Sequence, residues 1–167
     1  MIGLSQMSYK QDELTKIAAW RNENLISLRT NSKTDPANQK KWVESFGGSE
    51  KYFFIYDYQA NSKPKFVGYC GLDKINRVNK TAEMGLLIGT EFHKKGYGRA
   101  AANALLKYGF RDLNLNCIFI EVYNTTTNWN FWMKCGFVKE GRLLARKFWN
   151  GTFYSSVMAS FLRKDFT

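Results

Sequence analysis

The chain has 167 residues, 44% of them hydrophobic, which is enough for one domain spanning residues 1–167 with a core of its own. With 25 Lys and Arg against 14 Asp and Glu, the net charge of +11 favours an anionic partner and argues against a polycationic substrate, although a general basic bias that keeps the protein soluble is the plainer alternative. No segment approaches the roughly 18 apolar residues of a membrane span and no secretory leader is apparent, so we expect a cytoplasmic protein without a membrane partner.

Hydrophobic periodicity and turn residues predict the following elements. In chain order they are a helix over 12–22, a helix from Asp35-Pro36 to Gly47-Gly48, a hairpin of strands 52–58 and 66–72, a strand over 81–89, a helix over 99–113, a strand over 117–123, a helix over 127–135, and a hairpin of 137–148 with 152–162. Asp35 is a helix cap followed by proline at the first position, and Asn150-Gly151 is a strong hairpin turn. This order predicts an α+β fold, layered α/β/α, with about four helices flanking a mixed, mostly antiparallel sheet of six to seven strands.

The three cysteines, Cys70, Cys117 and Cys135, are odd in number and unevenly spaced. They lie in apolar segments, which predicts buried free thiols. Together with the single histidine, His93, they show no zinc-ligand spacing. We therefore expect no metal.

A basic run with two glycines, His93-Lys94-Lys95-Gly96-Tyr97-Gly98-Arg99, lies between the predicted strand 81–89 and the predicted helix 99–113. Glycine lets a backbone approach a ligand closely, and a helix N-terminus adds free N–H donors with a partial positive charge. The run therefore predicts a phosphate-binding cradle and a nucleotide-like cofactor.

This run resembles the signature of the GCN5-related N-acetyltransferase superfamily: Arg or Gln, two residues, Gly, one residue, then Gly or Ala. The leading residue here is His93, which departs from the pattern. Lys134-Cys135-Gly136-Phe137 resembles a second stretch of that family. Glu140-Gly141-Arg142 resembles its ribosomal-protein-alanine N-acetyltransferase-like branch, as do Trp20-Arg21-Asn22 and, further along, Arg29 and Trp42. The resemblance covers about the whole chain.

The resemblance implies acetyl-CoA as the donor and a primary amine as the acceptor. The sheet would splay beside residues 84–88, where the pantetheine arm would pair with edge groups of Leu86 and Ile88. The backbone N–H groups of residues 95–99 would hold the pyrophosphate, and nearby cations would balance its charge. The implied cofactor-binding residues are Leu86, Leu87, Ile88, His93, Lys94, Lys95, Gly96, Tyr97, Gly98, Arg99, Asn124, Asn128, Trp132 and Lys134.

Attack on a thioester needs a neutral amine, so a base or a water relay is useful. Glu83 is the first candidate, with a solvated strand-end charge as its alternative. Glu121 is the rival, because a charge in an apolar strand needs a partner or a role. Trp132 replaces the tyrosine that serves relatives as an acid, which leaves Tyr123 or Tyr97 as substitutes, or a thiolate that departs into solvent.

Arg21 and Arg29 border the acceptor groove in the resembling fold, and Trp42 is placed with them. The arginines would clamp a phosphate or carboxylate of the acceptor, with structural salt bridges as the alternative. A nucleotide-linked amino sugar fits the basic charge and the Trp20-Arg21-Asn22 start, whereas a protein N-terminus fits the downstream stretches that resemble the ribosomal-protein branch. Polyamines and aminoglycosides are disfavoured by like-charge repulsion.

The alternative function is a non-catalytic basic protein that binds RNA or another anionic ligand. No RNA-binding signature supports it, so a nucleic-acid partner is not expected. Exposed strand edges favour a homodimer.

Overall fold

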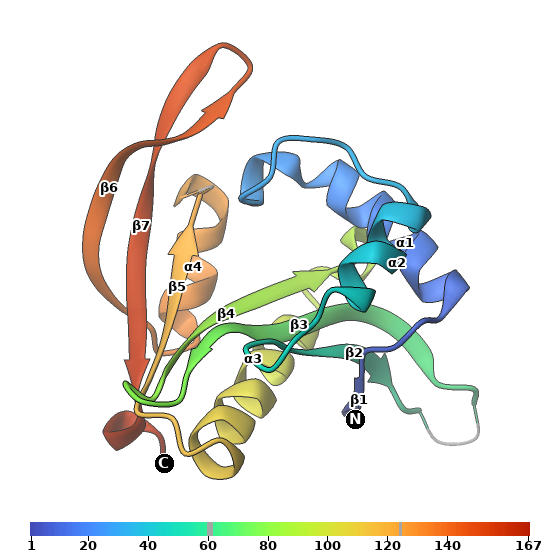
Figure 1. Cartoon of the computed structure of the whole chain (residues 1–167), viewed down its shortest axis with the longest axis horizontal. Coiled ribbons are helices and arrows are strands. Elements are labelled where there is room, and N and C mark those ends of the chain that lie inside the picture. The colour runs from blue at the N-terminus through green and yellow to red at the C-terminus, as the bar shows by residue number, and fades with distance from the viewer. Residues whose placement is uncertain (60–61, 124) are drawn as a thin grey trace.

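The computed structural model describes residues 1–59, 62–123 and 125–167. Four α-helices occur in these residues: α1 (Gln11–Glu23), α2 (Pro36–Glu44), α3 (Tyr97–Lys107) and α4 (Thr125–Lys134). The strands are β1 (Ile2–Gln6), β2 (Lys51–Asp57), β3 (Lys65–Asn76), β4 (Thr81–Ile88), β5 (Cys117–Val122), β6 (Val138–Trp149) and β7 (Thr152–Leu162). The predicted α+β class, the mixed sheet and the flanking helices are confirmed (Figure 1).

One seven-stranded sheet runs through the described residues in the order β1-β2-β3-β4-β5-β7-β6. Neighbouring strands are antiparallel except β4 and β5, which are parallel. Their register runs from Thr81 opposite Cys117 to Glu83 opposite Phe119 and then ends. Beyond it the two strands diverge, so the sheet splays at its centre (Figure 1).

Helices α1 and α3 cover opposite faces of the sheet. The side chain of Ile88 lies 3.7 Å from where a Cβ on Gly98 of α3 would be, whereas a Cβ on Gly89 would meet Trp20 of α1 at 2.4 Å. Because successive strand residues point to opposite faces, the two helices pack on the two sides of β4. The core is therefore divided into two layers, and the splay opens between them.

The ends of α2 show how local chemistry defines a helix. The carboxylate of Asp35 accepts a hydrogen bond from the N–H of Asn38 at 2.7 Å, and Pro36 occupies the first turn, as predicted. The helix ends at Glu44 rather than at the predicted Gly47-Gly48. The Ser45 hydroxyl donates to the Trp42 carbonyl at 2.7 Å, which satisfies the last turn before the glycines are reached.

The sequence prediction has no element before residue 12, but β1 forms there and pairs with β2. Polar Ser5 and Gln6 hide its alternating pattern. Gly3 further weakens the strand signal, because glycine is depleted in strands. In the structure a Cβ on Gly3 would meet the Tyr58 ring at 2.6 Å. The Asn150-Gly151 turn forms as predicted, with both residues at positive φ.

Candidate active site

The edge of β4 that faces the splay belongs to Leu86 and Ile88. A hydrogen bond from the Gly89 N–H to the Val67 carbonyl sets the phase of the β3–β4 ladder. In that phase Leu87 turns its backbone groups toward β3, whereas Leu86 and Ile88 turn theirs toward β5. The register of β4 with β5 ends before these residues, so their edge borders the gap into which an amide-bearing ligand could insert.

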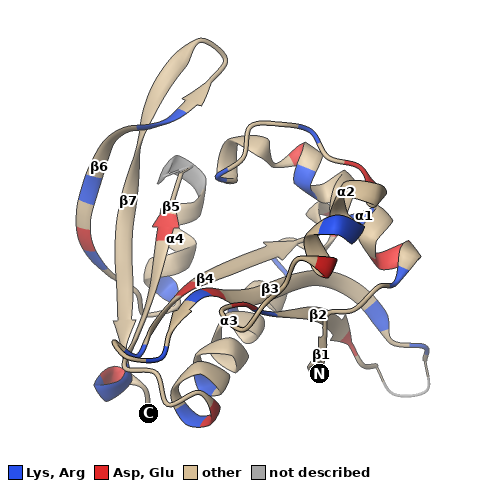
Figure 2. Ribbon diagram, viewed as in Figure 1, with Lys and Arg blue, Asp and Glu red and all other residues tan. Residues whose placement is uncertain are grey.

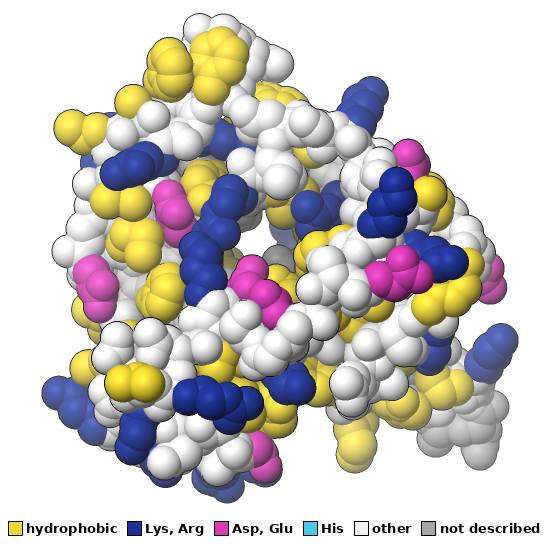
Figure 3. Space-filling model, viewed as in Figure 1, with side chains coloured by type: hydrophobic (Ala, Val, Ile, Leu, Met, Phe, Trp, Pro, Cys, Tyr) yellow, Lys and Arg dark blue, Asp and Glu magenta, His cyan; other side chains and the backbone are white. Residues whose placement is uncertain are grey.

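A chain of polar side chains joins the two sides of the splay. Its members, in order of contact, are Lys74, Glu83, Arg29, Tyr123, Glu121 and Ser156. They come from β3, β4, the segment after α1, the residue after β5, β5 itself and β7. Four of these residues, which the sequence marks as catalytic or acceptor-binding candidates, therefore meet in one place. The space-filling view shows this face hollowed at its centre, with acidic and basic side chains on the rim (Figure 3).

Two cations engage Glu83, whose side chain is 12% exposed. The Arg29 guanidinium donates to Oε1, and the Lys74 ammonium lies 2.7 Å from Oε2 without hydrogen-bond geometry. Both carboxylate oxygens of Glu83 therefore face a cation, one from the segment after α1 and one from β3.

Tyr123 connects Arg29 to Glu121. Its hydroxyl accepts from Nε of Arg29 at 3.0 Å and donates to Oε2 of Glu121 at 2.9 Å. Oε1 of Glu121 accepts from the Ser156 hydroxyl at 2.6 Å. Burial is the largest cause that raises the pKa of Tyr123, and the bond to Glu121 adds to it against the opposing effect of Arg29. The phenol therefore keeps its proton at neutral pH.

Arg29 lies between the two carboxylates. It donates to Glu83 directly and connects to Glu121 through the Tyr123 hydroxyl. Burial alone would lower its pKa, but the hydrogen bond to Tyr123 and the charges of Glu83 and Glu121 outweigh this, so the pKa is raised. The guanidinium is a permanent positive charge in the centre of the site.

The run predicted as a phosphate cradle, residues 93–99, lies between β4 and α3. Gly96 has φ +84°, a conformation that suits glycine, and α3 begins at Tyr97 with no side-chain cap on its N–H groups. Gly98 sits in a tight place of another kind, because a Cβ there would lie 3.1 Å from the Phe131 ring of α4. The N-terminus of α3 is thus open and exposed, as an anion site requires.

Two side chains of the cradle are turned back onto the protein. The Lys95 ammonium donates to the Glu91 carbonyl at 2.9 Å. Nε2 of His93 lies 2.9 Å from the Ile88 carbonyl, so that nitrogen carries the hydrogen. The Ile88 carbonyl thus already takes part in one hydrogen bond within the protein, and the pairing of Leu86 and Ile88 with pantetheine stays a prediction. Lys94 and Arg99 are exposed beside the cradle.

The structure separates the two tyrosines proposed as substitutes for the family's acid. The Tyr97 hydroxyl donates to Asp57 at the end of β2, at 2.7 Å, so it points toward the β1–β2 edge. Trp132 is 9% exposed and packs edge-on between Phe131 and Phe137. Of the two tyrosines, Tyr123 is therefore the one that belongs to the polar chain.

The other predicted residues lie on α1, α2 and α4 or outside the described residues. Asn124 lies outside the described residues. Asn128 and Lys134 lie on α4, where Asn128 is half-buried. The Arg21 guanidinium donates to the Tyr69 hydroxyl at 2.8 Å and lies 5.6 Å from the Trp42 ring, on the same side of the sheet as α1 and α2.

Sequence reasoning missed Lys74 and Ser156. The predicted strand stops at Leu72, whereas β3 continues to Asn76 through an irregularity in which Lys74 takes φ +50°. This irregularity aims the lysine at Glu83. Ser156 has no signal of its own, because a serine in a strand is ordinary.

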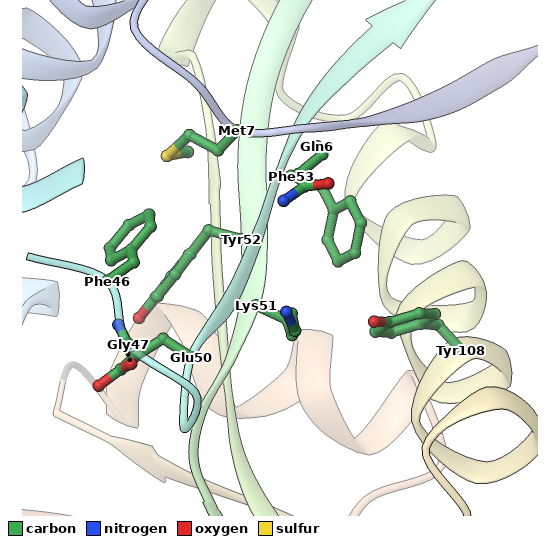
Figure 4. A pocket seen from close by; sticks show the side chains of 9 residues that line it. All are labelled: Gln6, Met7, Phe46, Gly47, Glu50, Lys51, Tyr52, Phe53 and Tyr108. Atoms are coloured by element: carbon green, nitrogen blue, oxygen red, sulfur yellow. Dashed lines mark hydrogen bonds between the residues drawn. The ribbon is translucent and has the colours of Figure 1, made fainter. Parts of the chain in front are cut away.

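A separate cavity of about 210 Å³ lies where β1 ends at the sheet edge (Figure 4). It is lined by Gln6, Met7, Phe46, Gly47, Glu50, Lys51, Tyr52, Phe53 and Tyr108. None of the predicted site residues lines it.

Three further findings concern the described part of the chain. No group of three or more His, Cys, Asp or Glu side chains there could hold a metal ion. None of its helices is long and apolar enough to cross a bilayer. The described cysteines are free, with Cys70 buried and Cys117 and Cys135 partly exposed, so burial is complete for one of the three thiols.

Comparisons with known proteins agree with this geometry. A family model described as an acetyltransferase (GNAT) domain matches residues 4–138. A spermidine N(1)-acetyltransferase of Vibrio cholerae is 33% identical over 106 residues, which is 63% of this chain and 59% of the relative. The Bacillus subtilis protein YdaF, named as a candidate ribosomal N-acetyltransferase, is 30% identical over 99 residues, or 59% of this chain and 54% of the relative.

The chain thus spans 54% to 59% of the length of these two curated relatives. A solved structure of a Vibrio cholerae spermidine N-acetyltransferase in complex with CoA and spermine covers 98% of this chain and 97% of that chain, with a TM-score of 0.85 at 23% identity. That likeness shows a shared fold. Because the family model matches well over half of the sequence, the chain belongs to the GNAT acetyltransferase family.

Proposed function

We propose that the protein is an acetyl-CoA-dependent N-acetyltransferase that moves the acetyl group to a primary amine by direct attack on the thioester. One observation carries this proposal. Glu83, Arg29, Tyr123 and Glu121 converge at the mouth of the splay, where the pair β4–β5 opens. The uncapped N-terminus of α3 lies at the other end of β4. A phosphate site and a proton-transfer cluster are thus joined by one free strand edge.

On the donor side, separate groups of residues suit separate parts of acetyl-CoA. The N–H groups at the start of α3 favour a pyrophosphate, and exposed Lys94 and Arg99 add positive charge. The backbone of Leu86 and the N–H of Ile88 would pair with the amides of the pantetheine arm.

The acceptor side supplies a route for one proton. An incoming ammonium must lose one proton before it attacks and a second as the amide forms, while the departing thiolate gains one. Glu121 would accept the first amine proton, directly or through water, and Tyr123 would give its own proton to the sulfur. Protonated Glu121 would then donate its proton to the Tyr123 phenolate across the same contact, and the second amine proton would leave to solvent. Glu83 would hold Arg29 and serve as the alternative base.

We further propose an acceptor that carries an anionic group, such as a nucleotide-linked amino sugar or a protein N-terminus with acidic neighbours. Residues 24–34 contain Arg29 and Lys33 but no acidic residue. The carboxylates that face the segment, Glu83 and Glu121, are already bonded. An additional cation would therefore meet like charge. A phosphate or carboxylate would meet Arg29, which is bonded to Glu83 and Tyr123 but whose side chain is 47% exposed, against 12% for Glu83.

Spermidine is a second candidate acceptor because the name of the Vibrio cholerae relative assigns that activity to it. Measuring thiol release from acetyl-CoA with a panel of amines separates the two. The panel holds spermidine, a nucleotide-linked amino sugar and an acidic peptide with a free N-terminus. The proposal predicts turnover of the anionic acceptors in preference to spermidine, and the opposite preference would overturn the acceptor class. If no amine is turned over, the enzyme proposal itself fails.

The rival function, a basic protein that binds RNA without catalysis, is tested by thermal shift. Lys and Arg positions are spread over the helices and strands instead of lining one face (Figure 2). An enzyme of this kind should gain stability with acetyl-CoA. Stabilisation by RNA oligonucleotides alone would favour the rival.

A homodimer remains a prediction. β6 is an edge strand of the sheet, and apolar side chains on its hairpin with β7 are exposed, among them Leu144 and Phe153. Light scattering across protein concentration would measure the mass in solution, and a monomer at all concentrations would contradict the prediction.

A further inference from the structure

Lys147 on β6 is a buried cation outside the polar chain. The residue is 2% exposed. Its ammonium donates to the carbonyls of Leu25 at 2.8 Å, Leu28 at 2.5 Å and Thr30 at 3.3 Å. Among the described residues, no carboxylate forms an ion pair with it.

Burying an ammonium without a counter-ion is unfavourable, so a side chain of this kind needs full hydrogen bonding to persist. The three N–H donors of Lys147 match the three carbonyls. Burial lowers its pKa. The carbonyls lie in and just after the short turn Leu25–Ser27, and the Leu25 carbonyl also accepts from the Leu28 N–H at 3.2 Å. Lys147 thus caps this segment from a distant strand.

The bonded carbonyls flank one residue of the polar chain. Leu28 and Thr30 are the two neighbours of Arg29, so Lys147 fixes the backbone on both sides of that arginine. A second bond, from the Asn31 amide to the Phe148 carbonyl at 2.8 Å, attaches the same segment to the next residue of β6. The Lys147 ammonium also lies 5.9 Å from the Tyr123 ring.

We infer that Lys147 is a positioning residue, which holds the segment of residues 25–31 on β6 so that the Arg29 guanidinium stays between Glu83 and Tyr123. The inference rests on the proposed function where it concerns acetyl transfer. It also makes a structural claim that needs no activity: without Lys147 the segment opens more often.

The activity test is a double-mutant cycle of Lys147→Met and Arg29→Ala. Loss of positioning by about 1 Å can cost on the order of 10²-fold in rate, so Lys147→Met should lower kcat/KM for the acceptor by about this factor. The KM for acetyl-CoA should not change. Because Lys147 acts through Arg29, the double variant should be no worse than Arg29→Ala alone. If the fold-losses in kcat/KM of the two single variants multiply in the double variant, the inference is overturned.

Arg146→Met is the matched control, since it removes a neighbouring charge from the same strand at an exposed position. It should leave kcat/KM unchanged, and a loss equal to that of Lys147→Met would show a general charge effect and contradict positioning.

Limited trypsin digestion tests the structural claim without acetyl transfer. Arg29 and Lys33 are exposed cleavage sites in or beside the held segment. Cleavage there should be faster in Lys147→Met than in the wild type or in Arg146→Met, because it reports local opening. Equal rates would overturn the inference. If the wild type acetylates no amine, the proposed function fails and digestion alone decides the role of Lys147. Should Lys147→Met not fold, Lys147→Gln, which keeps two N–H donors, is judged by the same criteria.

Discussion

The donor side and the acceptor side of the splay are built in different ways. The proposed cradle is one contiguous run, residues 93–99, and the groups proposed to bind the anion are main-chain N–H groups set by a glycine with positive φ and a helix start. The acceptor cluster consists of side chains from β3, β4, β5, β7 and the segment after α1. A main-chain site tolerates changes of side chain except where glycine is needed, whereas a cluster of side chains depends on each member.

The largest effect should come from Gly98→Glu. A carboxylate at the start of α3 would repel phosphates, and its Cβ would crowd the Phe131 ring. We expect acetyl-CoA affinity to fall by on the order of 10²-fold or more, which calorimetry would measure. Gly48→Glu, where a Cβ meets nothing within 4 Å, is the control for charge. Wild-type affinity in a folded Gly98→Glu protein would refute the cradle.

Tyr123→Phe should leave acetyl-CoA binding intact while lowering kcat, which distinguishes the acceptor cluster from the donor site. Removing a general acid costs on the order of 10²-fold in kcat. Thiol-release kinetics would measure this, with Tyr58→Phe at an exposed ring as control. An unchanged kcat would mean that the thiolate leaves into solvent without help from Tyr123.

Glu121→Gln and Glu83→Gln should differ in how the rate depends on pH. If Glu121 takes the amine proton, Glu121→Gln lowers kcat/KM about tenfold or more and removes the acidic limb of the profile. Glu83→Gln should mainly raise the KM of the acceptor, because it frees Arg29. The reverse pattern would make Glu83 the base.

Asp57→Asn should have the smallest effect and act on stability alone. The hydrogen bond from Tyr97 is the first cause that lowers the pKa of Asp57. A carboxyl with a lowered folded pKa contributes stability above its unfolded pKa of about 3.9, and this is lost as the pH falls through the folded value. Asp57→Asn should thus flatten the acid side of the curve of unfolding free energy against pH. Exposed Asp165→Asn is the control, and identical acid profiles for Asp57→Asn and wild type would contradict the assignment.

The same contrast explains what the sequence could predict. The proposed cradle is local, so the spacing of Gly96 and Gly98 was enough to predict a helix that starts beside them, as it does. Glu83, Glu121 and Tyr123 were selected as charges or phenols in or beside apolar strands, and this signal is also local. Their meeting with Arg29 depends on strand order and on the segment after α1.

Other parts had no signal in the sequence. Lys74 reaches Glu83 through an irregular strand end, and Lys147 looks like any lysine in a strand that faces water. Its burial follows from the way the β6–β7 hairpin meets the segment after α1. Contacts between distant segments are set by packing, which spacing within one segment does not encode.

The central claim is that one free strand edge links the cradle to the Tyr123 cluster. A crystal structure of the protein with CoA tests it most directly. The account predicts the pyrophosphate on the N–H groups of residues 95–99, pantetheine amides along Leu86, and the thiol in the splay facing Tyr123. CoA bound elsewhere, or with its thiol directed away from Tyr123, would contradict it.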